Sequence, residues 1–124
     1  MKSMVIFDAN MILRYLLNDN AEMAEKAENY LNQDTVTVTI EVIAEVVYVL
    51  KGVYHMTRKT IADTLKDFLL LVQCRDRETV NIALETYGNE NLDFVDCVLY
   101  GYHKVERMEV ATFDKKLLNL LNGY

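Results

Sequence analysis

Four acidic residues lie within or directly after apolar stretches of the chain, where a carboxylate needs an explanation. They are Asp8, Glu45, Asp96 and Asp114. Acidic side chains are rarely buried without a partner, and several converging carboxylates are well neutralised by a hard divalent ion such as Mg²⁺ or Mn²⁺. Such an ion activates water and stabilises phosphoryl oxygens. The four residues are therefore candidate ligands of a catalytic metal.

Each carboxylate also has a simpler interpretation as part of the scaffold. Asp8 and Asp114 each precede a predicted helix and could serve only as its N-cap. Glu45 lies in a mostly apolar helix, so we expect it to be buried on most sides and to need either a metal or a basic partner, which the sequence does not identify. Asp93 is expected to cap the helix that follows it, whereas Asp96, nearer the apolar body of that helix, is the better ligand.

Polar residues close to these acids in the sequence could form a second shell that orients the ligands or holds water. The candidates are Asn10, Thr39, Asp93 and Thr112. For the two threonines, ordinary positions in a strand or at a helix cap are the simpler interpretation.

Short apolar or β-branched runs alternate with helical periodicity along the chain, and these elements must position the acids. The predicted strands are residues 3–7, 35–38, 72–74 and 109–112. The predicted helices are residues 9–17, 21–32, 40–51, 58–71, 76–87, 94–106 and 115–121, with Gly52 and Gly88 as helix ends. The alternation indicates an α/β fold with a parallel sheet covered on both faces. Ligands bind beyond the carboxyl ends of such strands, where Asp8 and Asp114 both stand.

The composition indicates a single domain, residues 1–124, with a sizeable core. Hydrophobic residues make up 52%, and the absence of proline together with only four glycines leaves no linker. The net charge of −6 excludes a bulk basic footprint for nucleic acid, but not a nuclease with a bound metal. Cys74 and Cys97 have no ligand-like spacing with His55 and His103, so zinc is not expected. The thiols suit a reducing, cytoplasmic location, and neither a signal peptide nor a membrane span is expected.

The stretches around the four acids are similar to those of a known family. Four stretches resemble the PIN-domain family: residues 5–10, 39–50, 92–96 and 111–117. In size and spacing the chain most resembles the VapC-type toxins of bacterial and archaeal toxin–antitoxin pairs, over essentially its whole length. The resemblance implies a PIN-like three-layer α/β/α fold with a central, mostly parallel sheet.

The same resemblance implies a metal-dependent endoribonuclease. Asp8, Glu45, Asp96 and Asp114 would then hold one or two Mg²⁺ or Mn²⁺ ions, and metal-bound hydroxide would attack an RNA phosphodiester in line. Asp93 matches a commonly acidic position of the family and would assist through water.

The resemblance also implies partners. It implies a homodimer and a cognate antitoxin whose tail blocks the active site, and helices 9–17 and 21–32 are candidate walls of the antitoxin groove. RNA must bind despite the acidic charge, and for most basic clusters solvated charge is the simpler interpretation. The clusters are Lys51, Arg58 with Lys59, Arg75 with Arg77, and Lys115 with Lys116.

Three other classes of protein fit the sequence less well. A haloacid-dehalogenase-type phosphatase also has an Asp after its first strand, but it needs a second Asp two residues later, where this chain has Asn10. A response-regulator receiver domain has adjacent acids after its first strand, and this chain does not. A catalytically weak PIN-like module, acting mainly in dimerisation or antitoxin binding, is the remaining alternative. Intact carboxylates argue against it.

Overall fold

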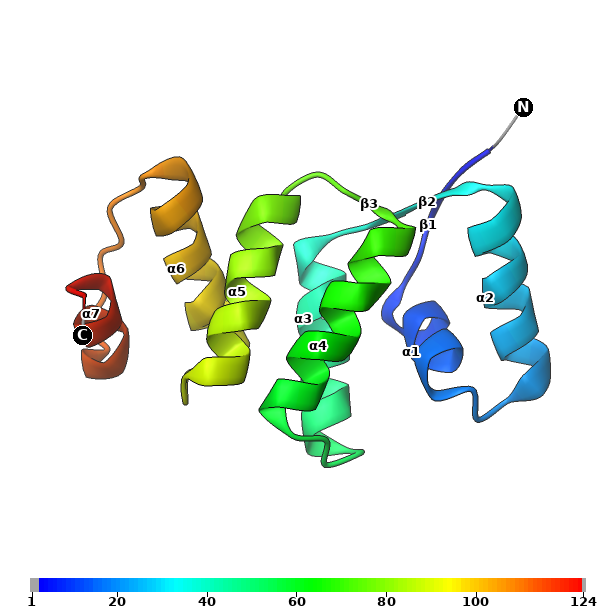
Figure 1. The fold of residues 1–124 in the computed structure, drawn as a ribbon, viewed down its shortest axis with the longest axis horizontal. Helices are drawn as coiled ribbons and strands as arrows, with labels where there is room; N and C mark the ends of the chain where they lie inside the picture. Colours follow the sequence, from blue (N-terminus) through cyan, green and yellow to red (C-terminus); the bar gives the residue numbers. More distant parts are fainter. Residues whose placement is uncertain (1–2, 124) are drawn as a thin grey trace.

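Three short parallel strands form one sheet in the part of the chain that this computed structural model describes, residues 3–123 (Figure 1). The strands are β1 (Met4–Ile6), β2 (Thr35–Val38) and β3 (Gln73–Cys74), in the order β1-β2-β3. Each lies within a predicted strand, and β2 consists entirely of β-branched residues, which suit extended backbone. The α/β class and the parallel sheet are therefore confirmed. The single domain over 1–124 stays a prediction, and its residues 1, 2 and 124 lie outside the described part.

One face of the sheet is buried, and the other is open at β1. Val36, Val38 and Cys74 are buried on the first face. On the opposite face of β1, Met4 is 84% exposed and Ile6 is 64% exposed. Side chains alternate between the two faces of a strand, so both residues share the uncovered face. The predicted covering of both faces is thus incomplete at β1.

Among residues 3–123, seven α-helices flank the sheet or extend away from it to one side (Figure 1). They are α1 (Ala9–Leu17), α2 (Ala21–Gln33), α3 (Ile40–Gly52), α4 (Arg58–Phe68), α5 (Arg77–Asn89), α6 (Phe94–Glu106) and α7 (Lys115–Leu121). A 3₁₀ turn, η1 (Leu69–Leu71), continues α4. Within residues 3–123, none of the helices combines the length and the apolar character that crossing a bilayer requires.

Side-chain caps begin most of these helices. Asp8 Oδ1 accepts a hydrogen bond from the Met11 amide at 2.9 Å, and Asp114 Oδ1 accepts one from the Leu117 amide at 2.8 Å. Three more helices have side-chain caps: Asn20 caps α2, Thr39 caps α3 and Thr57 caps α4. A cap satisfies an N–H group that has no partner within its helix, which is worth about 1 kcal/mol. The simpler interpretations of Asp8, Thr39 and Asp114 as caps are therefore observed.

Two arginines tie consecutive elements together through backbone carbonyl groups. Arg58 Nη1 donates to the carbonyl oxygens of Tyr87, Glu90 and Leu92 at 3.2, 2.9 and 2.7 Å, and the guanidinium carbon lies 4.2 Å from the centre of the Tyr87 ring. Arg77 donates in the same way to carbonyl oxygens of η1 and of the residue that follows it. Both side chains therefore serve the fold, whereas solvated charge is the simpler expectation from the sequence.

Helix α6 packs very closely on α5. A Cβ atom added at Gly101 of α6 would lie 2.7 Å from the carbonyl oxygen of Thr79 in α5, closer than real Cβ atoms come to backbone. Because only glycine permits this approach, the position of α6 on α5 is well determined. Figure 1 shows α4, α5 and α6 in a row, with α7 at its end.

Two helix ends differ by two or more residues from those predicted. Helix α5 runs to Asn89, past the predicted stop at Gly88. A Cβ atom at Gly88 would lie 3.0 Å from the Cβ of Ala62 in α4, so this glycine permits close packing and does not end the helix. The predicted helix 58–71 changes to 3₁₀ geometry after Phe68.

The predicted strand 109–112 is wrong for this structure. The chain between α6 and α7 has irregular backbone. Within the described part, none of residues 109–113 takes part in a backbone–backbone hydrogen bond. The β-branched residues of this segment favour a strand, but a strand forms only beside a partner that accepts its backbone hydrogen bonds.

Candidate acidic site

Three of the acidic residues line one hollow between α6 and α7. Asp93 directly precedes α6, Asp96 lies in its first turn, and Asp114 caps α7. The hollow has a volume of about 300 Å³, and we call it the α6–α7 hollow. It is lined by Asn91, Leu92, Asp93, Asp96, Asp114, Lys115 and Lys116. The hollow forms where the starts of α6 and α7 lie near each other, because the acids at both helix starts line the same space.

The carboxylates of the α6–α7 hollow repel one another. Burial raises the pKa of the partly buried Asp96, and the negative charges of Asp114 and Asp93 raise it further. Asp93 occupies the N-cap position of α6, as expected, but its side chain accepts no capping hydrogen bond in the described structure. Its carboxylate therefore adds charge to the hollow without being engaged by the helix. A cation would relieve this repulsion.

Glu45 is exposed, so the expectation that it is buried on most sides is wrong. The buried stripe of α3 follows helical spacing through Ile43, Val46, Val47 and Leu50. Glu45 lies outside this stripe and shares the exposed face with Glu41 and Tyr48. The high overall content of apolar residues in α3 thus obscured the fact that one of its faces is exposed. Asp8 is also exposed, and it caps α1.

One chain does not gather all four predicted ligands. Within residues 3–123, no group of three or more His, Cys, Asp or Glu side chains is arranged to hold a metal ion. Figure 1 shows α6 and α7 at the end of the molecule opposite to β1, α1 and α2. The donor set of the α6–α7 hollow has the hard oxygen chemistry that Mg²⁺ prefers, but its arrangement in a single chain does not complete a coordination sphere. The roles of Asp8, Glu45, Asp96 and Asp114 as ligands stay predictions.

The predicted second-shell residues are distributed in the same way. Thr112 Oγ1 accepts a hydrogen bond from the Asp114 amide at 3.1 Å, so it helps to position the start of α7. Thr39 Oγ1 accepts one from the Val42 amide at 3.3 Å and acts as a cap of α3. Asn10 is exposed on α1. A role for these residues around a metal is untested.

The sequence did not single out every residue of the α6–α7 hollow. Asn91 lines it beside Leu92, and the available signal was a polar residue just before the cap position of a predicted helix. Lys115 and Lys116, which the sequence did offer as a candidate basic cluster, also line it. Two ammonium groups beside carboxylates provide a place where a phosphate group is attracted at the edge of an acidic site.

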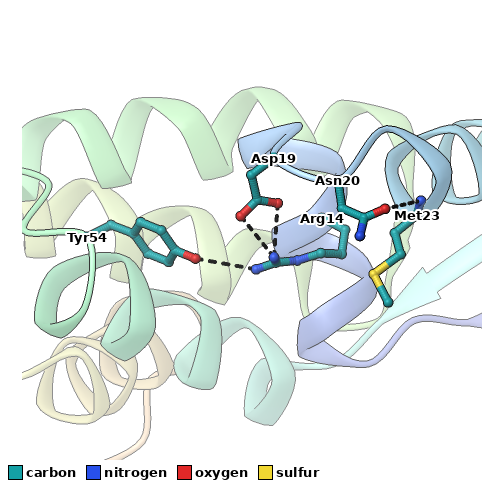
Figure 2. A network of polar contacts seen from close by, with 5 residues as sticks. All are labelled: Arg14, Asp19, Asn20, Met23 and Tyr54. Atoms are coloured by element: carbon teal, nitrogen blue, oxygen red, sulfur yellow. Dashed lines mark hydrogen bonds and ion pairs between the residues drawn. The ribbon is translucent and has the colours of Figure 1, made fainter.

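A second and larger groove lies between α1 and α2. It has a volume of about 650 Å³, and its lining includes Asn10, Met11, Arg14 and Met23. Arg14 Nη1 donates to both carboxylate oxygens of Asp19 at 2.9 Å, and Nη2 lies 3.5 Å from the Tyr54 hydroxyl (Figure 2). The guanidinium is thereby held in place. We call this the α1–α2 groove; it is bounded by the two helices expected as walls of a partner groove.

Comparison with protein families identifies the chain. A profile of the PIN domain matches residues 5–120, which is nearly the entire chain. Searches of curated proteins and of solved structures find no significant match. PIN domains are generally nucleases and typically use divalent metal ions. The chain therefore belongs to the PIN domain family.

Proposed function

We propose that the protein is a metal-dependent endoribonuclease that cleaves RNA phosphodiester bonds and acts as the toxin of a type II toxin–antitoxin system. The observation that carries this proposal is the α6–α7 hollow, where Asp93, Asp96 and Asp114 face one another beside Lys115 and Lys116. Membership of a family of nucleases supports it. Carboxylates alone, without His or Cys, suit Mg²⁺ or Mn²⁺.

The residues of the α6–α7 hollow have distinct roles in this proposal. Asp96 is partly buried between two other carboxylates, so it gains most from a neighbouring cation. Asp114 has one oxygen committed to the Leu117 amide and one remaining for a ligand. Lys115 and Lys116 attract the RNA backbone, which offsets the repulsion expected from an acidic protein. Asp8 and Glu45 remain the other proposed ligands.

We propose the α1–α2 groove as the binding site of the antitoxin. Its volume of about 650 Å³ accommodates several side chains of a partner segment. Met11 and Met23 provide apolar, adaptable contacts. Because Asp19 already pairs with Arg14, this arginine does not add a free positive charge to the groove.

Cleavage of RNA tests the proposed activity. Purified protein is incubated with total cellular RNA and either Mg²⁺ or Mn²⁺, beside the variants Asp96→Asn and Asp8→Asn. We expect both variants to lose activity by more than about 100-fold, which exceeds the usual cost of removing a residue that only orients a metal ligand. The matched control is Glu28→Gln, which removes an exposed acid of α2 and should cleave like the parent.

The main alternative is a binding module without strong catalysis. Within residues 3–123 no three His, Cys, Asp or Glu side chains are arranged to hold an ion, and this favours the alternative, because a single chain does not complete the proposed ligand set. Equal cleavage by the parent and both Asp→Asn variants would contradict the proposed site. Absence of cleavage by the parent with either ion would contradict the nuclease function itself.

A further inference from the structure

Two further hollows continue from the α6–α7 hollow. The first has a volume of about 200 Å³ and shares Asn91 and Lys116 with it. The second has a volume of about 310 Å³ and shares Leu120 with the first. Because each hollow shares walls with the next, the three form one depression bounded by α5, α6 and α7, which we call the α5–α7 trough. It begins at the acids and ends beside Tyr100 and Lys104.

The spacing of residues along α6 gives the direction of the trough. Asp96, Tyr100 and Lys104 follow one another at intervals of four residues, so they lie on one face of this helix. At 1.5 Å per residue they span about 12 Å of the helix axis. On α7, Lys116 and Leu120 are likewise one turn apart. Both helices therefore begin at the acids and run in the same direction along the trough.

The far end of the trough combines an aromatic ring with a positive charge. Tyr100 is partly buried and lines the last hollow, and Lys104 Nζ lies 5.9 Å from the centre of its ring. Asn119 lines the middle hollow with an amide that can both donate and accept hydrogen bonds. Aromatic rings that stack on bases, beside cations that attract the backbone, are the means by which proteins bind single-stranded nucleic acid.

The charge of the trough is mixed, which distinguishes it from a basic patch. Lys104 and Lys116 line the two farther hollows together with Glu85 and Glu90. A duplex carries phosphates at twice the density of one strand, so acidic walls repel it more strongly. A single strand can turn its phosphates toward the lysines and a base toward Tyr100. The trough therefore favours single-stranded over duplex RNA.

We propose that the α5–α7 trough binds a single-stranded segment of the RNA on one side of the bond that is cleaved in the α6–α7 hollow. A base stacks on Tyr100, and Lys104 and Lys116 attract the adjoining phosphates. A stacked strand rises about 3.4 Å per nucleotide, so about three nucleotides cover the distance from Asp96 to Lys104. This assignment rests on the proposed nuclease function, because it describes how the substrate of that same site is held.

Binding of RNA in the presence of a chelator tests the trough apart from cleavage, since the proposed cleavage needs a metal ion. Fluorescence anisotropy of a short labelled single-stranded RNA measures the affinity. We expect Tyr100→Leu to weaken binding by about 10-fold, because a stacking ring is lost. Tyr100→Phe keeps the ring and should bind like the parent.

The salt dependence of the same binding tests the lysines. Lys104→Gln should weaken binding and reduce the slope of log affinity against log salt by about 0.7, as expected for one phosphate contact with a single strand. The matched control is Lys51→Gln, which removes an exposed lysine of α3 and should change neither quantity. Circular dichroism checks that the variants fold, and if Tyr100→Leu does not, Lys104→Gln decides.

The outcomes separate the trough from the nuclease function. A parent that does not bind single-stranded RNA, equal binding of duplex RNA, or equal effects of Lys104→Gln and Lys51→Gln would overturn the trough. An active parent whose KM for single-stranded RNA is unchanged in Tyr100→Leu and Lys104→Gln would also overturn it, while the nuclease function stands. If binding depends on Tyr100 and Lys104 but the parent cleaves no RNA with Mg²⁺ or Mn²⁺, the trough stands and the nuclease function fails.

Discussion

The N-terminal acids and the α6–α7 hollow contain the same kind of residue in very different surroundings. Asp8 and Glu45 are exposed, and Asp8 is satisfied by the amide that it caps. Burial raises the pKa of Asp96 above the usual value, and the two neighbouring carboxylates raise it further. The N-terminal acids are stable without a ligand, whereas the carboxylates of the α6–α7 hollow repel one another unless a cation binds. Spacing in the sequence suggested one role for all of these acids, but only their surroundings distinguish the acids that need a cation.

The largest expected effect concerns the support of the α6–α7 hollow. Arg58→Ala removes three hydrogen bonds to carbonyl oxygens of the segment that precedes Asp93. It also removes the contact with the Tyr87 ring. We expect a loss of about 3 kcal/mol in the free energy of unfolding, because hydrogen bonds to charged groups are strong and the carbonyl groups lose their partner. Urea unfolding measures it.

The matched control for Arg58 is its neighbour in the sequence. Lys59 is exposed and pairs with Asp63 at 3.3 Å across one turn of α4. Lys59→Ala should therefore change the free energy of unfolding by less than about 0.5 kcal/mol. Similar losses for both variants would mean that Arg58 does not support the α6–α7 hollow.

A smaller effect is expected where α6 meets α5. Gly101→Ala places a Cβ atom 2.7 Å from the Thr79 carbonyl oxygen, so α6 must move and take Asp96 with it. Overpacking of this kind costs about 2 kcal/mol. Gly52→Ala is the control, because nothing lies within 4 Å of its added Cβ. We expect Gly52→Ala to be neutral or stabilising in urea unfolding, and a destabilisation equal to that of Gly101→Ala would contradict the close packing of α6.

The smallest effect has the opposite sign and compares the two regions directly. The native state holds the proton of Asp96 more tightly than the unfolded chain does, so this residue lowers stability as pH rises from its usual pKa of 3.8 through the raised pKa. In chelator at pH 7, Asp96→Asn should therefore unfold at a slightly higher temperature than the parent. Below the usual pKa of Asp the difference should vanish. Asp8→Asn should change little, because Asn caps a helix as well as Asp does.

The outcome of these melting curves separates the two regions. If Asp8→Asn raises the unfolding temperature as much as Asp96→Asn does, the contrast between a satisfied cap and a crowded carboxylate is wrong. Addition of Mg²⁺ or Mn²⁺ should stabilise the parent more than Asp96→Asn, since an ion that binds only the folded state adds to its stability.

Local signals predicted most elements of the fold, whereas the misses depended on contacts. Helices α1, α6 and α7 have the predicted bounds because their caps and apolar spacing are local properties. The strand 109–112 was missed because a strand needs a neighbour that propensity does not reveal. Gly88 was misread because a glycine that permits close packing resembles one that ends a helix.

The candidate site was predictable in its residue types and not in its geometry. The acids of the α6–α7 hollow lie at the starts of two helices that follow one another, so their meeting depends on a short connection. Whether Asp8 lies near these acids depends on tertiary structure, which the local sequence does not determine. The exposure of Glu45 was readable from the buried spacing of α3, because Ile43, Val46, Val47 and Leu50 complete a stripe without it.

The cap of α7 has a consequence for how this helix responds to its surroundings. One oxygen of the Asp114 carboxylate accepts a hydrogen bond from the Leu117 amide, and the backbone amide of Asp114 donates one to Thr112 Oγ1. A ligand that bound both oxygens of Asp114 would compete with the Leu117 amide for Oδ1 and so weaken the first turn of a seven-residue helix. Amide hydrogen exchange at Leu117 thus reports how Asp114 is used: slow exchange accompanies single-oxygen ligation, and fast exchange accompanies ligation through both.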